Sequence, residues 1–201
     1  PFAQKKGEPM NFYQTVRRLT AAPILAGALL IILGLHRRTI FSSPWQWSAS
    51  LLFLTVLPLL AYPLQRYFPR FREQGRRGQR TLAMIFAVAG YLLGCVSCLI
   101  FPTSPALRTV YLEYLLCGIV LLLVNKVFRR KASGHACGVT GPVLLLLYFG
   151  LYPQAAAGAA LTVLTWIASI RTGRHTLPQL LAGSLISLAA MAVLAIVSGI
   201  F

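Results

Sequence analysis

The sequence predicts an all-α integral membrane protein, a bundle of about seven transmembrane helices, or six if one apolar run does not cross. Composition is the first reason: 57% of the 201 residues are hydrophobic and only 11% are charged, with a mean hydropathy of +0.72. Length is the second. A helix needs about 20 mainly apolar residues to cross a membrane, so these spans use almost the whole chain and leave no room for a soluble domain.

Four apolar runs predict the first four helices, at about 19–35, 48–64, 81–101 and 109–128. Trp45 and Trp47 precede the second run, as aromatic residues do at membrane interfaces. The arginine-rich segment 66–80 leads into the third run, in which Gly90 and Gly94 have the GxxxG spacing that permits close helix packing.

Three further runs predict the last helices, at about 138–152, 155–170 and 177–201. Pro153 marks a tight turn between the first two of them. The run at 155–170 is rich in Ala and Gly, which is typical of a closely packed membrane helix. The breaks before 138 and before 177 are polar, and they hold the candidate site.

The start of the chain is polar. We assign residues 1–18 to an N-terminal polar segment and residues 19–201 to one transmembrane helical domain. Residues 1–9 are interpreted as derived from an expression vector, with Met10 as the natural start, and are left out of the fold.

The net charge of +16 comes from 19 Lys and Arg against three Glu, with no Asp. An excess of Lys and Arg over acidic residues can indicate nucleic-acid binding. Here the charges lie in short breaks between apolar runs, so no nucleic-acid partner is expected. The missing Asp argues against membrane transferases that hold Mg²⁺ on aspartates. We expect no metal and no cofactor.

Charge also predicts the orientation. With seven spans, only Arg37, Arg38 and Arg108 lie on one side, which leaves 16 of the 19 Lys and Arg on the other, together with the N-terminus and both polar breaks. Positive residues favour the cytosolic side. We therefore expect an integral protein of a bacterial or archaeal cell membrane with its site on the cytosolic face, unless the first run does not cross.

The break between 128 and 138 concentrates groups that suit a phosphate. It contains Lys131, Ser133, Gly134 and His135, and Lys126 stands just before it. Cations neutralise phosphate charge, and a hydroxyl and an exposed backbone N–H at a helix start bind its oxygens.

The break between 170 and 177 repeats this chemistry with Arg171, Arg174 and His175, and Gln179 follows. Two spans separate the two breaks, so both emerge on the same face. His135 and His175 are therefore expected to meet at one site.

These residues resemble the type-2 phosphatidic acid phosphatase superfamily, whose motifs are KxxxxxxRP, PSGH and SRxxxxxHxxxD. The resemblance covers about residues 110–190 and implies a phosphatase-like core at about 81–201. It implies a metal-independent membrane phosphatase in which Ser133 and Gly134 cradle the phosphate, His135 donates a proton, and His175 is the nucleophile that becomes phosphorylated.

The chain departs from that pattern in four places. Ala132 replaces the proline of PSGH, and no RP follows a lysine at the expected spacing. Ser169 stands where the third motif has arginine, and Arg171 lies four residues before His175. Gln179 stands where the motif has aspartate. The sequence thus resembles a divergent branch with H-T-x-x-Q in the third motif.

The resemblance implies hydrolysis of a lipid phosphate or an isoprenoid diphosphate through a phosphohistidine. Two alternatives stay open: a phosphotransferase that passes the group to another acceptor, and a non-catalytic binder or transporter of lipid phosphates. The expected partners are the substrate and membrane lipids.

Three residues have alternative roles. Gln179 can orient His175, or it can be the third helical residue of a capping box that begins at Thr176. Glu113 is an acid within a predicted span, for which we favour an interfacial or structural role. His36 is interpreted as an interfacial residue beside two arginines.

Overall fold

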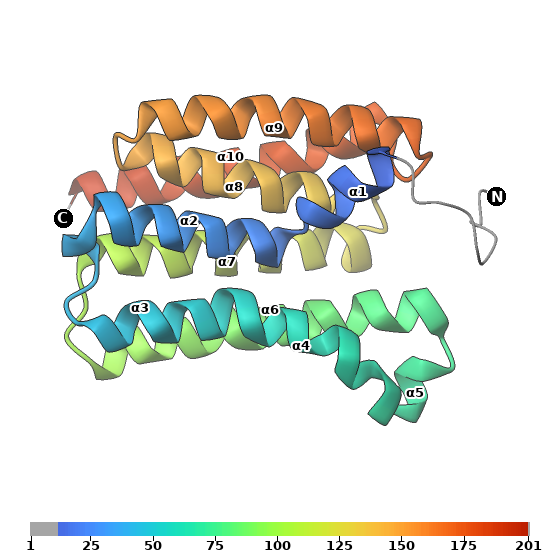
Figure 1. Cartoon of the computed structure of the whole chain (residues 1–201), viewed down its shortest axis with the longest axis horizontal. Coiled ribbons are helices and arrows are strands. Elements are labelled where there is room, and N and C mark those ends of the chain that lie inside the picture. Colours follow the sequence, from blue (N-terminus) through green and yellow to red (C-terminus); the bar gives the residue numbers. More distant parts are fainter. Residues whose placement is uncertain (1–11, 201) are drawn as a thin grey trace. The chain divides into compact units, whose positions relative to one another are not determined.

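The chain was analysed in a computed structural model that describes residues 12–200, with side chains to residue 197. The expected vector-derived residues 1–9 and Met10 lie outside these residues. The described part consists of helices joined by short turns and loops, without strands (Figure 1). Its α-helices are α1 (Phe12–Leu19), α2 (Ala22–His36), α3 (Pro44–Leu51), α4 (Leu57–Leu64), α5 (Pro69–Arg72), α6 (Gly75–Ile100), α7 (Pro105–Leu122), α8 (Gly134–Tyr148), α9 (Tyr152–Arg171) and α10 (Leu177–Ile200).

The helices confirm the all-α membrane fold. Five stretches of the described residues are long and apolar enough to cross a membrane, and α1 with α2 makes a sixth if this pair, bent by 56°, counts as one span. The five are Pro44–Tyr67, Gly75–Ile100, Pro105–Val127, Tyr152–Arg171 and Leu177–Val197. Helix α8 is apolar but has only 15 residues, so the predicted fifth run is a shorter helix.

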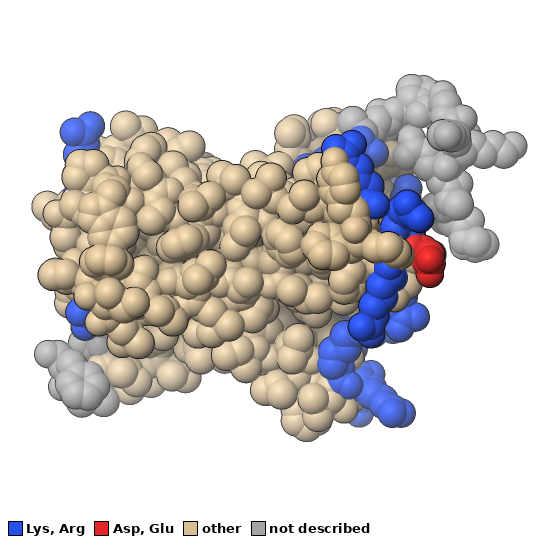
Figure 2. Space-filling view, turned by 90° about the horizontal axis from the view of Figure 1, so that it is seen from below, with Lys and Arg blue, Asp and Glu red and all other residues tan. Residues whose placement is uncertain are grey.

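Charge is distributed as a membrane requires. Lys and Arg gather at helix ends, and other residues cover the helix sides (Figure 2). Large apolar side chains such as Ile196 and Leu99 are exposed on these sides. In a protein that spans the hydrocarbon, such side chains face lipid instead of water.

The chain divides into two compact units. Among the described residues, one unit, which we call the motif unit, contains residues 12–25 and 121–192; the other, the scaffold unit, contains residues 26–120 and 193–200. Sequence analysis predicted one domain with a core at about 81–201. Of the helices, α6 and most of α7 belong to the scaffold unit, and α1 belongs to the motif unit.

In the scaffold unit, α6 packs through its two spaced glycines. A side chain at Gly90 would overlap the Phe53 carbonyl, and one at Gly94 would overlap the ring of Tyr111 on α7. The Tyr111 hydroxyl forms a 2.8 Å hydrogen bond with Ser50 on α3. The GxxxG prediction of close packing is therefore confirmed.

Glu113 lies inside the scaffold unit, at 1% exposure. Its Oε1 accepts the S–H of Cys117, one turn along α7, at 3.3 Å. Of the interfacial or structural role expected for Glu113, the structural one fits this burial, because its side chain is enclosed within the unit. His36 is exposed at the end of α2, where its Nδ1 lies 3.1 Å from the Ile32 carbonyl.

In the motif unit, α8 is surrounded by closely approaching helices. A side chain at Gly138 would overlap Ala22 at the start of α2, and one at Gly183 of α10 would overlap the Ser133 carbonyl. Helices α8 and α9 run side by side, and α9 also contacts α1. These contacts hold the N-terminal ends of α8 and α10 together.

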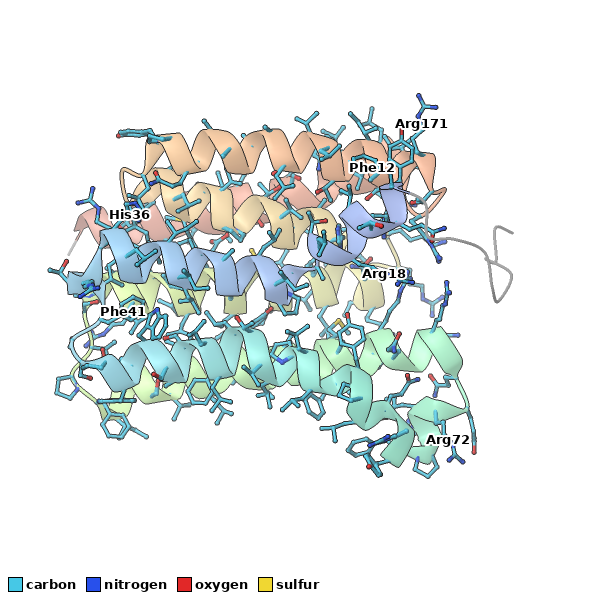
Figure 3. The ribbon with its side chains drawn as sticks, in the orientation of Figure 1. Phe12, Arg18, His36, Phe41, Arg72 and Arg171 are labelled. Atoms are coloured by element: carbon cyan, nitrogen blue, oxygen red, sulfur yellow. The ribbon has the colours of Figure 1, made fainter. Side chains whose placement is uncertain are left out.

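Helix α1 differs from the prediction that residues 1–18 lie outside the domain. Residues 12–19 form a helix whose Val16 is buried, while Phe12 is exposed. Phe12, Arg18 and Arg171 lie at the same end of the motif unit (Figure 3). An eight-residue amphipathic helix with two arginines has too few apolar residues to appear as a membrane run, which is why hydropathy missed it.

Candidate functional site

The two polar breaks are joined by their backbones. The Ser133 N–H donates to the Gln179 carbonyl at 2.9 Å. This contact is possible because Gly183, one turn further along α10, has no side chain to push the Ser133 carbonyl away. The prediction that the two breaks meet on one face is confirmed within the motif unit.

Ser133 is the N-cap of α8. Its hydroxyl accepts the Ala136 N–H at 3.2 Å, and the residue is 0% exposed. An N-cap oxygen satisfies one backbone donor that the helix start leaves unpaired. The structure therefore gives the Ser133 hydroxyl a capping bond, while its neighbour Gly134, the first residue of α8, is exposed.

The segment before Ser133 is held by Asn125. Its Oδ1 accepts the Ala132 N–H at 2.9 Å, and its Nδ2 donates to the Leu121 carbonyl at 2.9 Å. Proline has no N–H to donate, so the Ala132 that departs from the PSGH pattern makes a bond that proline cannot make.

His135 is oriented by Thr20, a residue that sequence analysis did not select. Thr20 Oγ1 lies 3.1 Å from His135 Nε2 and donates its one hydrogen to the Val16 carbonyl at 2.8 Å. Thr20 must therefore accept, so His135 Nε2 carries the hydrogen. Nδ1 is left as the nitrogen of His135 that can take up or release a proton.

The surroundings of His135 favour its neutral form. It lies in the first turn of α8, outside the candidate spans. Burial, as the largest cause, together with the positive charges of Arg17 and His175, lowers its pKa from 6.5 to about 4. The effect of His175 places both histidines in one electrostatic environment. A bound anion between these groups would raise the pKa again.

His175 is oriented by Gln179. Gln179 Oε1 lies 3.2 Å from His175 Nδ1 and also accepts the Thr176 N–H at 3.5 Å. Because the same oxygen accepts both, Nδ1 of His175 is the donor and Nε2 carries the lone pair. Both interpretations of Gln179 therefore have a contact: it orients His175, and it makes a long capping bond at the start of α10.

The remaining predicted residues are cations in the two polar breaks or directly beside them. They are Lys126, Lys131, Arg171 and Arg174, and all four side chains are exposed. Exposed cations attract an anion over a distance but are screened by salt. All four charges therefore lie where solvent and salt reach them.

Arg17 is the second residue that sequence analysis missed. Its Nη1 donates to Ser169 Oγ at 2.6 Å, and Ser169 is 0% exposed. The signal was present in the spacing: Tyr13, Val16 and Thr20 recur at helical intervals, and Arg17 adjoins that face.

The motif unit has a strongly positive site. Its described residues, 12–25 and 121–192, contain eight Lys and Arg and no Asp or Glu. No group of three His, Cys, Asp or Glu among the described residues of the whole chain can hold a metal ion.

No protein-family model matches the sequence, and no curated protein or solved structure matches it either.

Proposed function

We propose that the protein is a membrane phosphatase that hydrolyses a lipid phosphate or an isoprenoid diphosphate through a phosphohistidine. The observation that carries the proposal is the pair of histidines at one positively charged end of the motif unit. Each is held in a defined tautomer, His135 by Thr20 and His175 by Gln179. One then has a lone pair for attack, and the other has a nitrogen for proton transfer.

In the first step, the Nε2 lone pair of His175 attacks phosphorus and forms an N–P bond. The P–O bond to the lipid breaks, and the leaving oxygen takes a proton from Nδ1 of protonated His135. His135 is neutral at pH 7 without substrate, because its pKa is about 4. The negative charge of bound phosphate raises that pKa, so substrate binding itself promotes the protonation of His135 at Nδ1.

In the second step, a water molecule attacks the phosphorus of phosphorylated His175. Nδ1 of His135 accepts the proton from the water, the N–P bond breaks, and its electrons return to Nε2 of His175. Cations around the site stabilise the charge that spreads over the phosphoryl oxygens in both transition states.

The substrate class follows from where the site lies. The histidines lie at the ends of helices whose sides carry exposed apolar residues, so a polar head can reach the site while its apolar tail stays in the lipid. The excess of Lys and Arg at this end of the motif unit supports a cytosolic site. Phosphatidate-type lipids and isoprenoid diphosphates both have this form.

A phosphate-release assay tests the proposal. Purified protein in detergent is given phosphatidate, a lysophosphatidate and an isoprenoid diphosphate, each with EDTA. We expect release from at least one substrate, unchanged by EDTA. Release that stops in EDTA and returns with Mg²⁺ or Zn²⁺ would contradict the proposal. Salt-sensitive lipid-phosphate binding without release would support the binder, and appearance of the group on an acceptor other than water would support a phosphotransferase.

Gln179 allows a test of how His175 is stabilised. A carboxylate in its place would hold the positive charge that develops on His175, and bonds to charged groups contribute about 1.5–3 kcal/mol against 0.5–1.5 for neutral ones. Gln179→Asp is therefore expected to raise kcat about tenfold, and Gln179→Ala to lower it. Variants that change the melting temperature in detergent but match wild-type kcat would leave Gln179 as a helix cap only.

A further inference from the structure

Helix α1 brings two polar side chains to the histidine site. Arg17 lies in the last turn of α1, and Thr20 directly follows the helix and continues its hydrogen bonding, with its N–H on the Val16 carbonyl at 2.9 Å. Arg17 contacts Ser169 on α9, and Thr20 contacts His135 on α8. A helix that hydropathy places outside the domain thus reaches both neighbouring helices of the site.

The contact of Arg17 with Ser169 brings a positive charge to a position at which the chain has no arginine. Ser169 stands six residues before His175, where the third motif of the resembled superfamily has its arginine. A serine hydroxyl brings no charge to that position. The guanidinium lying against the hydroxyl belongs to a residue 152 positions earlier in the chain.

Arg17 is placed differently from the other cations of the motif unit. It is half-buried, whereas Lys131, Arg171 and Arg174 are exposed. A half-buried charge is screened less by salt and water than an exposed one. Its charge also acts on His135, since it is one of the causes that lower the pKa of that histidine.

We propose that Arg17 binds the substrate phosphate, and that α1 delivers it in place of the arginine missing at position 169. The planar guanidinium suits this role because it can bind two phosphate oxygens at once. The hydrogen bond to Ser169 then fixes the orientation of that plane. This proposal rests on the phosphatase function and makes Phe12–Leu19 a part of the binding site.

Arg17→Ala tests the proposal against a matched control, Arg18→Ala, which removes an exposed charge from the same helix. Binding of inorganic phosphate is measured by thermal shift in detergent, and kcat/KM is measured with the best lipid phosphate. Loss of a charge-assisted contact is expected to weaken both about 10- to 100-fold in Arg17→Ala. Arg18→Ala is expected to stay within about twofold of wild type.

Two further variants separate phosphate binding from a structural role. Arg17→Gln keeps a donor for Ser169 but loses the charge, so it is expected to bind phosphate as weakly as Arg17→Ala. Adding Ser169→Arg to Arg17→Ala returns an arginine to the motif position. The double variant is expected to recover at least about half of the lost phosphate affinity, measured on a logarithmic scale. If the double variant does not fold, Arg17→Gln alone decides.

The outcomes distinguish this proposal from the function on which it rests. Wild-type phosphate affinity in Arg17→Gln, with intact lipid phosphatase activity, would overturn the role of Arg17 and leave the phosphatase standing. Arg17-dependent phosphate binding without any phosphate release would support the role of Arg17 and overturn the phosphatase function. A wild-type protein that does not bind inorganic phosphate at all would overturn both.

Discussion

Replacing His175 with alanine is expected to abolish phosphate release, lowering kcat on the order of 10⁴-fold or more. The imidazole of His175 is the group that forms the N–P bond. The variant has no other nucleophile in that place beside Gln179. In the structure, Nδ1 of His175 donates to Gln179 Oε1 at 3.2 Å, which leaves Nε2 with the lone pair. The measurement is kcat with saturating lipid phosphate in detergent, at equal concentrations of folded protein.

Folding is the control for this variant. His175 lies between α9 and α10, and the junction of the two breaks is carried by the backbone of Ser133 and Gln179. His175→Ala is therefore expected to keep the wild-type elution volume and the ability to bind inorganic phosphate. More than a few per cent of wild-type activity would remove His175 from the role of nucleophile.

Replacing His135 with glutamine is expected to lower kcat about 10²- to 10⁴-fold, which is the usual contribution of general acid–base catalysis. Glutamine can still donate to Thr20, but it cannot transfer a proton to the leaving oxygen. The donor form of His135 is lost as pH rises through its substrate-bound pKa. The wild-type profile of kcat should therefore fall on its alkaline side, and this fall should be absent from the variant.

The stability of the substrate-free protein gives a control with a defined sign. The pKa of His135 is lowered from 6.5 to about 4 in the folded state, so the unfolded chain binds more protons between these values. Stability should therefore fall as pH drops from 6.5 towards 4. His135→Gln should lose part of this fall. Equal pH dependence in the two proteins would contradict the burial of His135.

Hydropathy predicted much of the fold, because length and apolar composition decide what can cross a membrane. The runs predicted at 109–128 and 155–170 correspond to Pro105–Val127 and α9. Helix α8 begins four residues before its predicted start at 138, because Ser133 caps it. Hydropathy does not record such a cap, since the polar residues Ser133 and His135 interrupt the apolar run.

The candidate site was predicted in part. Because two predicted spans separate the breaks of His135 and His175, these breaks were expected to meet on one face. Ser133 and Gln179 do meet. Thr20 and Arg17 were missed because their contacts are tertiary, across 115 and 152 residues of chain. A sequence pattern fixes spacing along one segment, and it cannot place a side chain from a helix so far away.

The central claim, a phosphohistidine formed at His175, is tested most directly by trapping the intermediate. Wild-type protein is mixed with the lipid phosphate that it turns over fastest, stopped in alkali within one turnover, digested and mapped by mass spectrometry. We expect an acid-labile, alkali-stable phosphoryl group on His175 in the wild-type protein and none in His175→Ala. Phosphate release at the wild-type rate without phosphorylated His175, or with the label on another residue, would contradict the account.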